Sequence, residues 1–436
     1  IIDFVPNHVA RQYHSIAKPL GVHDLGADDD KTKAFSPDNN FYYVPGTQLG
    51  GEVDLNDPVH GMYIEKPAKA TGNNRFDAWP NKNDWYETVK LNYGVDYMNN
   101  TGNHFDPVPD TWKKMRDILL FWSSKGIDGF RCDMAEMVPC EFWGWVIPQI
   151  KQKHAKLTFI AEVYNPNEYR NYIHNGHFDY LYDKVGLYDT LRALTCGYAS
   201  ATAITGCWQS VNDIQSHMLN FLENHDEQRI ASEFFAGDAR KALPALLVSA
   251  CMNTNPMMIY FGQELGEPGM DSEGFSGRDG RTTIFDYWSV DSIRRWSNHG
   301  RYNLHLLNDQ EKELRHFYQT VLTLCNKEKA ISKGEFFDLM YVNSDGWMMN
   351  PHRQYVFMRK CDDELLLVIT NFDSIPVNIS VNIPQHAFDF WGMRQYPEIK
   401  SRDLLTGKSE KIAFCADKPV VTDVPAYGGK ILKIKL

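Results

Sequence analysis

The stretch GIDGFRCD, residues 126–133, decides the fold of this 436-residue chain. Its short apolar first half predicts a buried strand, and its end presents an arginine and a carboxylate. Because residues i and i+2 of a strand share a face, we expect Arg131 and Asp133 to point the same way at the strand's carboxyl end. A guanidinium beside a carboxylate favours the ionised form, which suits a nucleophile. A purely structural salt bridge is the alternative interpretation.

Three further stretches follow the same plan. They read DFVPNH at residues 3–8, TFIAEV at 158–163 and NFLENHD at 220–226. Each is a short apolar strand that ends in polar, reactive residues, and helical segments separate them. Strands that alternate with helices predict a parallel sheet with crossovers. Functional residues at the carboxyl ends of several strands indicate a (β/α)8 barrel, whose sites are built there.

The other elements follow from periodicity and from capping residues. A helix over residues 110–125 is predicted to begin at Asp110 and to bury a stripe of Trp112, Met115, Leu119 and Trp122. Additional strands are predicted at 177–183 and 257–262, and helices at 141–153, 187–194, 208–216, 238–251 and 311–327. These strands bring the barrel to six. Since eight are needed for closure and the first residue is Ile1, we expect the first two strands to lie upstream of residue 1.

Two regions fall outside the alternating pattern. Residues 9–109 are irregular and rich in Gly, Pro, Asn and Asp, and a connection of that length predicts either a functional segment or an inserted subdomain. From residue 333 the chain becomes a series of short β-rich runs, which predicts an antiparallel β-sandwich. The predicted domains are therefore a catalytic barrel at 1–332, with the insertion at about 9–109, and a sandwich at 333–436.

Composition excludes several classes of protein. The net charge of −11 argues against a nucleic-acid partner, which needs a basic footprint. No apolar run approaches the roughly 20 residues that span a bilayer. The eight cysteines show no CxxC spacing and do not resemble a disulfide framework. The aromatic content of 13% suits stacking on sugar rings, although a large core also uses aromatics.

In this order, the four stretches resemble the four signature regions of the α-amylase family of glycoside hydrolases: DxxxNH, GFRxD, a strand ending in Glu162, and NHD. The resemblance covers roughly residues 1–330. It implies a (β/α)8 TIM barrel with a subdomain inserted after the third strand and a C-terminal β domain. It also implies Asp133 as the nucleophile, Glu162 as the general acid/base and Asp226 as the third carboxylate. The apolar residues around Glu162 are expected to raise its pKa, as an acid requires.

The resemblance implies further site residues. His8 and His225 would hydrogen-bond sugar hydroxyls as neutral imidazoles, and Arg131 would lie beside the nucleophile. Asn7 would ligate a structural Ca²⁺, which takes six to eight oxygens. Many α-amylases carry Lys and His where this chain has Glu136 and Met137, and the backbone carbonyl of Met137 could still serve the ion.

A loop with the sequence GRDGRTT, residues 277–283, is similar to one that lies near the non-reducing sugar in α-glucosidases of the family. Asp279 and Arg281 are its candidate substrate-binding residues. A salt bridge between loops is the alternative.

The predicted function is retaining hydrolysis of α-1,4-glucosidic bonds in starch-like α-glucans or maltooligosaccharides, with endo-acting cleavage favoured. An exo-acting α-glucosidase, a neopullulanase or a glucan transferase of the same family stays open. A carbohydrate-binding relative without catalysis is a further alternative, although such relatives usually lack one of the three carboxylates. The sequence gives neither the compartment nor the oligomeric state.

Overall fold

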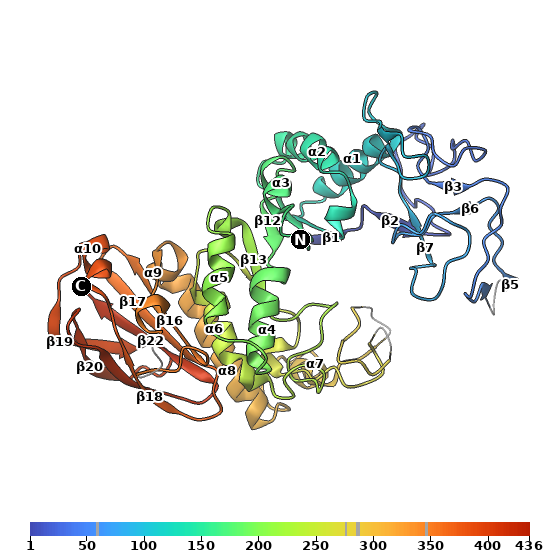
Figure 1. Cartoon of the computed structure of the whole chain (residues 1–436). Helices are drawn as coiled ribbons and strands as arrows, with labels where there is room; N and C mark the ends of the chain where they lie inside the picture. Colours follow the sequence, from blue (N-terminus) through green and yellow to red (C-terminus); the bar gives the residue numbers. More distant parts are fainter. Residues whose placement is uncertain (58–60, 275–276, 285–287, 345–347) are drawn as a thin grey trace. The chain divides into compact units, whose positions relative to one another are not determined.

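The computed structural model describes residues 1–57, 61–274, 277–284, 288–344 and 348–436 (Figure 1). The chain divides into two compact units, Ile1–Tyr182 and Asp183–Leu436. The first unit contains the long irregular region and the DFVPNH, GIDGFRCD and TFIAEV stretches. The second contains NFLENHD, the GRDGRTT loop and the β-rich tail.

The first unit is built on a parallel sheet in the order β1 (Ile2–Phe4), β10 (Gly129–Cys132), β11 (Thr158–Ala161) and β12 (Tyr180–Tyr182). Phe4, Cys132, Ala161 and Leu181 lie in register across it. A side chain on Gly129 would meet the carbonyl oxygen of Thr158 at 2.2 Å, so glycine permits this close pairing. The register brings residues that follow β10 and β11 to the same edge of the sheet.

The helices of the first unit pack against the sheet, and aromatic side chains form much of the core between them. They are α1 (Asp110–Ser123), α2 (Cys140–Lys153) and α3 (Tyr169–His174). Trp143 of α2 lies fully buried, with ring centroids 6.4 Å from Phe4 and 4.8 Å from Phe178. Many aromatic residues of this unit therefore belong to its hydrophobic core. The predicted helices at 110–125 and 141–153 are confirmed.

Two details of the first helix differ from the prediction. Pro109, not Asp110, holds the N-cap position, because Asp110 already has helical geometry. Trp122 is 45% exposed and lies against Phe121 at the surface, so the buried stripe ends at Leu119.

The described part of the irregular region contains four two-stranded antiparallel ladders. They pair β2 (His8–Ala10) with β7 (Thr88–Lys90), β3 (Tyr43–Val44) with β6 (Ala68–Lys69), β4 (Asn56–Asp57) with β5 (Gly61–Met62), and β8 (Val95–Asp96) with β9 (Gly102–Asn103). Strands β2 and β7 lie side by side (Figure 1), and their register places residue 8 opposite residue 90. A buried ion pair of 2.7 Å between Arg11 and Glu65 adds a second long-range tie.

The second unit begins with parallel strands β13 (Met218–Phe221) and β14 (Met257–Met258). Its helices are α4 (Asp189–Thr195), α5 (Ala203–Ser210), α6 (Leu243–Cys251), α7 (Asp291–Ser297), α8 (Asp309–Lys327) and α9 (Lys329–Ser332). The predicted helix at 208–216 is wrong in its bounds, because α5 starts at Ala203 and ends before Val211. Helix α7 was not predicted. The six parallel strands fall in the stretches that the sequence singled out.

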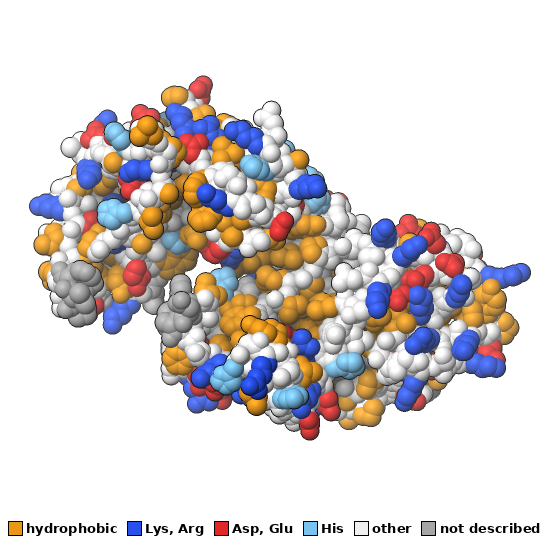
Figure 2. All heavy atoms as spheres, turned by 180° about the vertical axis from the view of Figure 1, so that it is seen from behind, with side chains coloured by type: hydrophobic (Ala, Val, Ile, Leu, Met, Phe, Trp, Pro, Cys, Tyr) orange, Lys and Arg blue, Asp and Glu red, His pale blue; other side chains and the backbone are white. Residues whose placement is uncertain are grey.

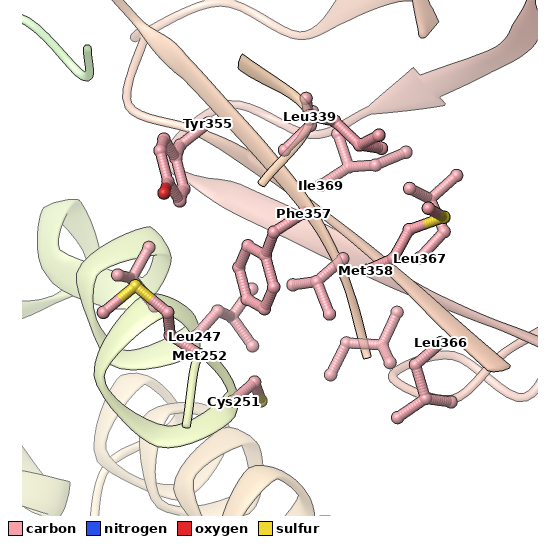
Figure 3. Packing of buried hydrophobic residues seen from close by; sticks show 14 of the residues in the cluster. Leu247, Cys251, Met252, Leu339, Tyr355, Phe357, Met358, Leu366, Leu367 and Ile369 are labelled. Atoms are coloured by element: carbon pink, nitrogen blue, oxygen red, sulfur yellow. The ribbon is translucent and has the colours of Figure 1, made fainter. Parts of the chain in front are cut away.

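The β-rich tail forms an antiparallel sheet in the order β15 (Glu335–Asp338), β16 (Gln354–Cys361), β17 (Glu364–Asn371), β22 (Gly428–Lys435), β19 (Tyr396–Asp403) and β20 (Ser409–Phe414). Strands β18 (Val377–Val381) and β21 (Val420–Val424) pair beside it, and α10 (Gln385–Trp391) follows β18. The predicted C-terminal β-sandwich is confirmed. Helix α6 packs on this sheet, with Leu247 and Met252 near Tyr355 and Phe357 (Figure 3).

The surface carries charges of both signs. Lys and Arg side chains are interspersed with Asp and Glu on the face drawn in Figure 2. Within the described ranges, no helix combines the length and the apolar character needed to cross a membrane. All eight cysteines are free thiols, and Cys132 and Cys251 are buried as their apolar surroundings predict.

We expect Arg359 to be the most sensitive position of the sandwich. This fully buried side chain of β16 donates hydrogen bonds of 2.7–3.0 Å to the carbonyl oxygens of Met252, Ala330, Ile331 and Gly334. Lysine cannot reproduce this fork, so Arg359→Lys should lower the free energy of unfolding by about 3 kcal/mol. Urea denaturation measures the loss. The exposed Arg402→Lys serves as the control, and equal effects at both positions would contradict the assignment.

Candidate active site

One guanidinium joins the two carboxylates that the sequence placed at neighbouring strand ends. Arg131 Nη1 lies 2.8 Å from Asp133 Oδ1, and Arg131 Nη2 lies 2.8 Å from Glu162 Oε2. The first contact is a hydrogen bond, whereas the second is an ion pair without hydrogen-bond geometry. Because β10 and β11 are in register, the residues that follow them meet on this one cation.

Two further groups bind the same guanidinium. Asp3, which pairs in register with Arg131 across β1 and β10, lies 3.0 Å from Nη1. The Nε of Arg131 donates to the hydroxyl of Tyr182 at 3.3 Å. Burial opposes the charged form, but Tyr182 and the carboxylates of Glu162, Asp3 and Asp133 outweigh it and raise the pKa of Arg131. Arg131 is therefore a permanent cation at the centre of an acidic cluster.

Burial dominates the protonation of Asp133. It raises the pKa of the carboxyl to about 6, with the Glu162 and Asp3 charges adding to the rise and Arg131 opposing it. The carboxylate is thus ionised at neutral pH, but it becomes protonated in mildly acidic solution.

Glu162 lies deeper than Asp133, with 2% of the residue exposed. Its Oε2 accepts the backbone N–H of Met134 at 2.8 Å, and its Oε1 accepts the hydroxyl of Tyr164 in a short hydrogen bond. Met134 itself has a positive φ of 43°, which is uncommon for a residue other than glycine. The apolar surroundings expected from the FIAEV stretch describe the strand, whereas the carboxylate itself has polar partners.

His8 lies on β2, opposite Lys90 of β7. Burial, assisted by the positive charge of Lys90, lowers the pKa of His8 to about 4. The imidazole is therefore neutral over the physiological range, as its predicted role requires. The ring of Trp85 lies 5.5 Å from that of His8 and is partly exposed. Tyr42, Tyr43 and Tyr93 of the irregular region are buried in the core, so their rings are not exposed for stacking on a sugar.

Asn7, the predicted calcium ligand, is fully buried. Its Oδ1 accepts a 2.5 Å hydrogen bond from Lys90 Nζ, and its Nδ2 donates to the carbonyl oxygen of Gly72 at 2.8 Å. The ammonium also donates to the carbonyl oxygen of Met137 at 3.1 Å. Both oxygens that the resemblance assigned to calcium thus face a cation of the chain itself, and this arrangement does not fit a metal ion. Among the described residues, no group of three or more His, Cys, Asp or Glu side chains could hold a metal.

The second unit carries the other predicted residues in the turn after β13. The Oδ1 of Asn224 accepts the backbone N–H groups of Asp226 and Glu227, both at 2.9 Å, and this fixes the turn. His225 Nε2 lies 3.3 Å from Asp226 Oδ2. His225 and Asp226 are therefore neighbours in space as well as in sequence.

The GRDGRTT loop reaches the same turn. Arg281 Nε donates to the backbone oxygen of Asp226 at 2.6 Å, and Arg281 Nη1 pairs with Asp279 Oδ2 at 3.1 Å. The structure thus brings together Asp226, Asp279 and Arg281. The fully buried Arg229 forms an ion pair with Glu223 at 2.8 Å and donates a hydrogen bond to Thr282 at 2.9 Å. It therefore links the segment after β13 to the GRDGRTT loop.

Four side chains of the first unit escaped the sequence reasoning: Asp3, Lys90, Tyr164 and Tyr182. Asp3 was quoted within the DFVPNH motif, and the strand alternation that aligned Arg131 with Asp133 could have found it. Tyr164 stands two residues after Glu162 and offered a similar signal. Lys90 gave none, because it lies 83 residues from Asn7 in the sequence.

Residues 1–301 match the family model of the α-amylase catalytic domain. The chain therefore belongs to the α-amylase family. Its parallel strands, its C-terminal β-sandwich and the order of its four motifs agree with this membership.

Curated relatives of several activities resemble the chain. Alpha-amylase 3 of Dictyoglomus thermophilum is 24% identical over 82% of this chain and 68% of its own length. The cyclomaltodextrinase of a Bacillus species is 23% identical over 61% of this chain and 42% of its own. The α-1,4-glucan:maltose-1-phosphate maltosyltransferase of Cereibacter sphaeroides is 37% identical over 57 residues, which span 13% of this chain and 10% of that protein.

Solved structures share the fold. The α-amylase of Geobacillus thermoleovorans, determined with acarbose, superposes with a TM-score of 0.62 at 16% identity, covering 100% of this chain and 77% of that one. The maltogenic α-amylase AmyB of Thermotoga neapolitana gives a TM-score of 0.54 at 18% identity, covering 83% and 71%.

We expect Gly72→Ala to disturb His8. A Cβ at this position would lie 2.6 Å from Thr88 Oγ1 and 2.9 Å from His8 Cβ, so the β2–β7 ladder would have to shift. The substitution should lower the free energy of unfolding by about 1–3 kcal/mol, as overpacking does. It should also move the His8 imidazole, which the chemical shifts of its ring protons report in an NMR spectrum. Gly206→Ala, in open space on α5, is the control and should be neutral or slightly stabilising. An unchanged His8 signal in the Gly72 variant would refute this packing.

Proposed function

We propose that the protein hydrolyses α-1,4-glucosidic bonds in starch-like α-glucans or maltooligosaccharides with retention of anomeric configuration. The observation that carries the proposal is the pair of carboxylates, Asp133 and Glu162, held on the guanidinium of Arg131. Retaining glycosidases use two carboxyl groups about 5–5.5 Å apart, and the shared contact with one guanidinium brings these two carboxylates close together. Membership of the α-amylase family supplies the substrate class.

In the first step, an oxygen of Asp133 attacks the anomeric carbon while Glu162, in its acid form, gives a proton to the departing glycosidic oxygen. The bond from that carbon to the leaving group breaks, and a glycosyl ester forms on Asp133. In the second step, Glu162 takes a proton from water, the water oxygen attacks the same carbon, and the ester bond breaks. Two inversions give net retention.

Arg131 keeps the charge balanced through these steps. Before attack, Asp133 is the anion and Glu162 carries the proton. In the ester, Asp133 has lost its charge and Glu162 has become the anion. Since both carboxylates contact the same cation, one negative charge of the pair always faces Arg131. The guanidinium therefore needs no reorganisation as the negative charge passes from Asp133 to Glu162, as expected of a preorganised site.

The remaining predicted residues complete the proposal. The neutral imidazole of His8 is suited to hydrogen-bond a sugar hydroxyl, and the partly exposed Trp85 ring beside it offers an apolar face for a pyranose. We assign His225 to a sugar hydroxyl and Asp226 to the third carboxylate, which binds hydroxyls and favours a distorted ring. The support is their place in the NHD motif and the fixed turn that presents them.

A second candidate, exo-acting hydrolysis or glucan transfer, rests on the GRDGRTT loop. The contact of Arg281 with the Asp226 turn fits a loop that limits the length of the bound chain. The curated relatives include maltosyltransferases as well as a cyclomaltodextrinase, so glycosyl transfer occurs among similar proteins. We favour endo-acting cleavage, with Asp279 and Arg281 as the residues whose substitution would alter chain-length preference.

Product analysis on maltoheptaose and soluble starch tests this proposal. We expect a spread of intermediate oligosaccharides whose first-formed anomer, seen by ¹H NMR, is α. Asp133→Asn and Glu162→Gln should each lower kcat about 10³-fold or more, since each removes a reacting group.

Glu141→Gln, on the exposed face of α2, is the matched control and should keep full activity. Glucose or maltose alone from the start would select the exo-acting candidate. A β anomer, or full activity in Asp133→Asn, would defeat the retaining mechanism.

The pKa of Asp133 predicts the acidic limb of the pH profile. Because burial raises it to about 6 and a nucleophile must be ionised, kcat/KM should fall about tenfold per unit as the pH drops below 6. Arg131 opposes the rise, so Arg131→Gln should move this limb to higher pH, whereas the exposed Arg301→Gln should leave it in place. A limb that stays put or moves to lower pH in Arg131→Gln would show that another group controls it.

A further inference from the structure

Lys90 places an amino group deep in the first unit, where burial lowers its pKa to about 7. The residue ends β7 and is 2% exposed. Its Nζ donates to Asn7 Oδ1 at 2.5 Å and to the carbonyl oxygen of Met137 at 3.1 Å, and it lies 6.0 Å from the centre of the Tyr97 ring. A buried ammonium requires such oxygen partners, because desolvation of an unpaired charge is costly.

The partners of Lys90 are oxygens that would suit a hard cation. One is a side-chain amide oxygen and the other a backbone carbonyl, and both are common ligands of Ca²⁺. The amide of Asn7 cannot turn away freely, since its Nδ2 donates to Gly72 at 2.8 Å. A lysine nitrogen within hydrogen-bond distance of both oxygens leaves no room for a divalent ion beside it.

We propose that the Lys90 ammonium replaces a structural calcium ion, so that the first unit holds its fold without a metal at Asn7. This reverses the calcium expected from the family resemblance. It goes beyond the proposed activity and does not depend on it, because it concerns what ties the chain together.

The tie joins three distant segments. Asn7 follows β1, Lys90 belongs to the irregular region, and Met137 closes the short 3-10 turn Ala135–Met137 after the Asp133 strand end. The β2–β7 ladder, in which His8 pairs with Lys90, supplies the backbone half of the connection. A lysine can make this link because its long chain reaches from the ladder and its ammonium has three donors.

The experiment compares thermal unfolding of the purified protein in excess EDTA and in millimolar CaCl2. The wild type should unfold at the same temperature in both, within about 1 °C, since a ligand that does not bind cannot stabilise. Elemental analysis after dialysis against CaCl2 should find no calcium that depends on Asn7.

Three variants make the test specific. Lys90→Met should lower the unfolding temperature by about 5 °C or more in both buffers, because the oxygens of Asn7 and Met137 lose their donor. Lys153→Met, on the exposed end of α2, is the matched control and should leave the temperature unchanged. Asn7→Ala locates any calcium effect that the wild type shows.

A calcium-dependent rise in the wild type that Asn7→Ala abolishes would overturn the proposal. So would a Lys90→Met protein as stable as the wild type. A rise that survives Asn7→Ala would place the ion elsewhere and agree with Lys90 at this position. If Lys90→Met does not fold, the wild type and Asn7→Ala still decide the question.

Discussion

The guanidinium of Arg131 makes the contacts on which the candidate active site of the first unit depends. It touches the carboxylates of Asp3, Asp133 and Glu162, which come from the ends of three adjacent parallel strands. One positive charge cannot neutralise three negative ones, so the cluster favours the uptake of a proton. Burial is the largest cause of the raised pKa of Asp133, and the charges of Glu162 and Asp3 add to the rise while Arg131 opposes it. A retaining glycosidase exploits this condition, because its two carboxyl groups share one proton between them during the reaction.

The carboxyl groups of Asp133 and Glu162 differ in burial and in hydrogen-bond partners. Glu162 is almost inaccessible to solvent and accepts hydrogen bonds from the N–H of Met134 and the hydroxyl of Tyr164. Asp133 is more exposed and accepts a hydrogen bond from Arg131. Two backbone groups of the turn after Asp133 therefore make separate hydrogen bonds. Met134 reaches Glu162 through its backbone, and Met137 receives the ammonium of Lys90. The proposed replacement of calcium by Lys90 and the arrangement of the carboxylates thus meet in one short segment.

Much of this organisation could be predicted from the sequence, and the limits have physical reasons. Period-2 alternation aligned Arg131 with Asp133. Apolar strands that end in polar residues located β1, β10, β11 and β13, and the separately predicted strands at 177–183 and 257–262 located β12 and β14. The same reasoning missed the bounds of α5 and the exposure of Trp122, since tertiary contacts decide where a helix stops and which end is covered. It could not reach Lys90, because nothing local marks a lysine whose partners lie tens of residues away. The roles of His225, Asp226, Asp279 and Arg281 stay predictions, although the contacts of the Asp226 turn give them a common place.

Covalent trapping tests the central claim most directly. The Glu162→Gln variant is incubated with 5-fluoro-α-D-glucosyl fluoride, whose good leaving group needs no acid, so the glycosyl ester should form and persist. Peptide mass spectrometry then finds the labelled residue. We predict one fluoroglucosyl group per chain, on the peptide that contains GIDGFRCD and at Asp133. A label on another carboxylate, or turnover without any covalent intermediate, would contradict the account.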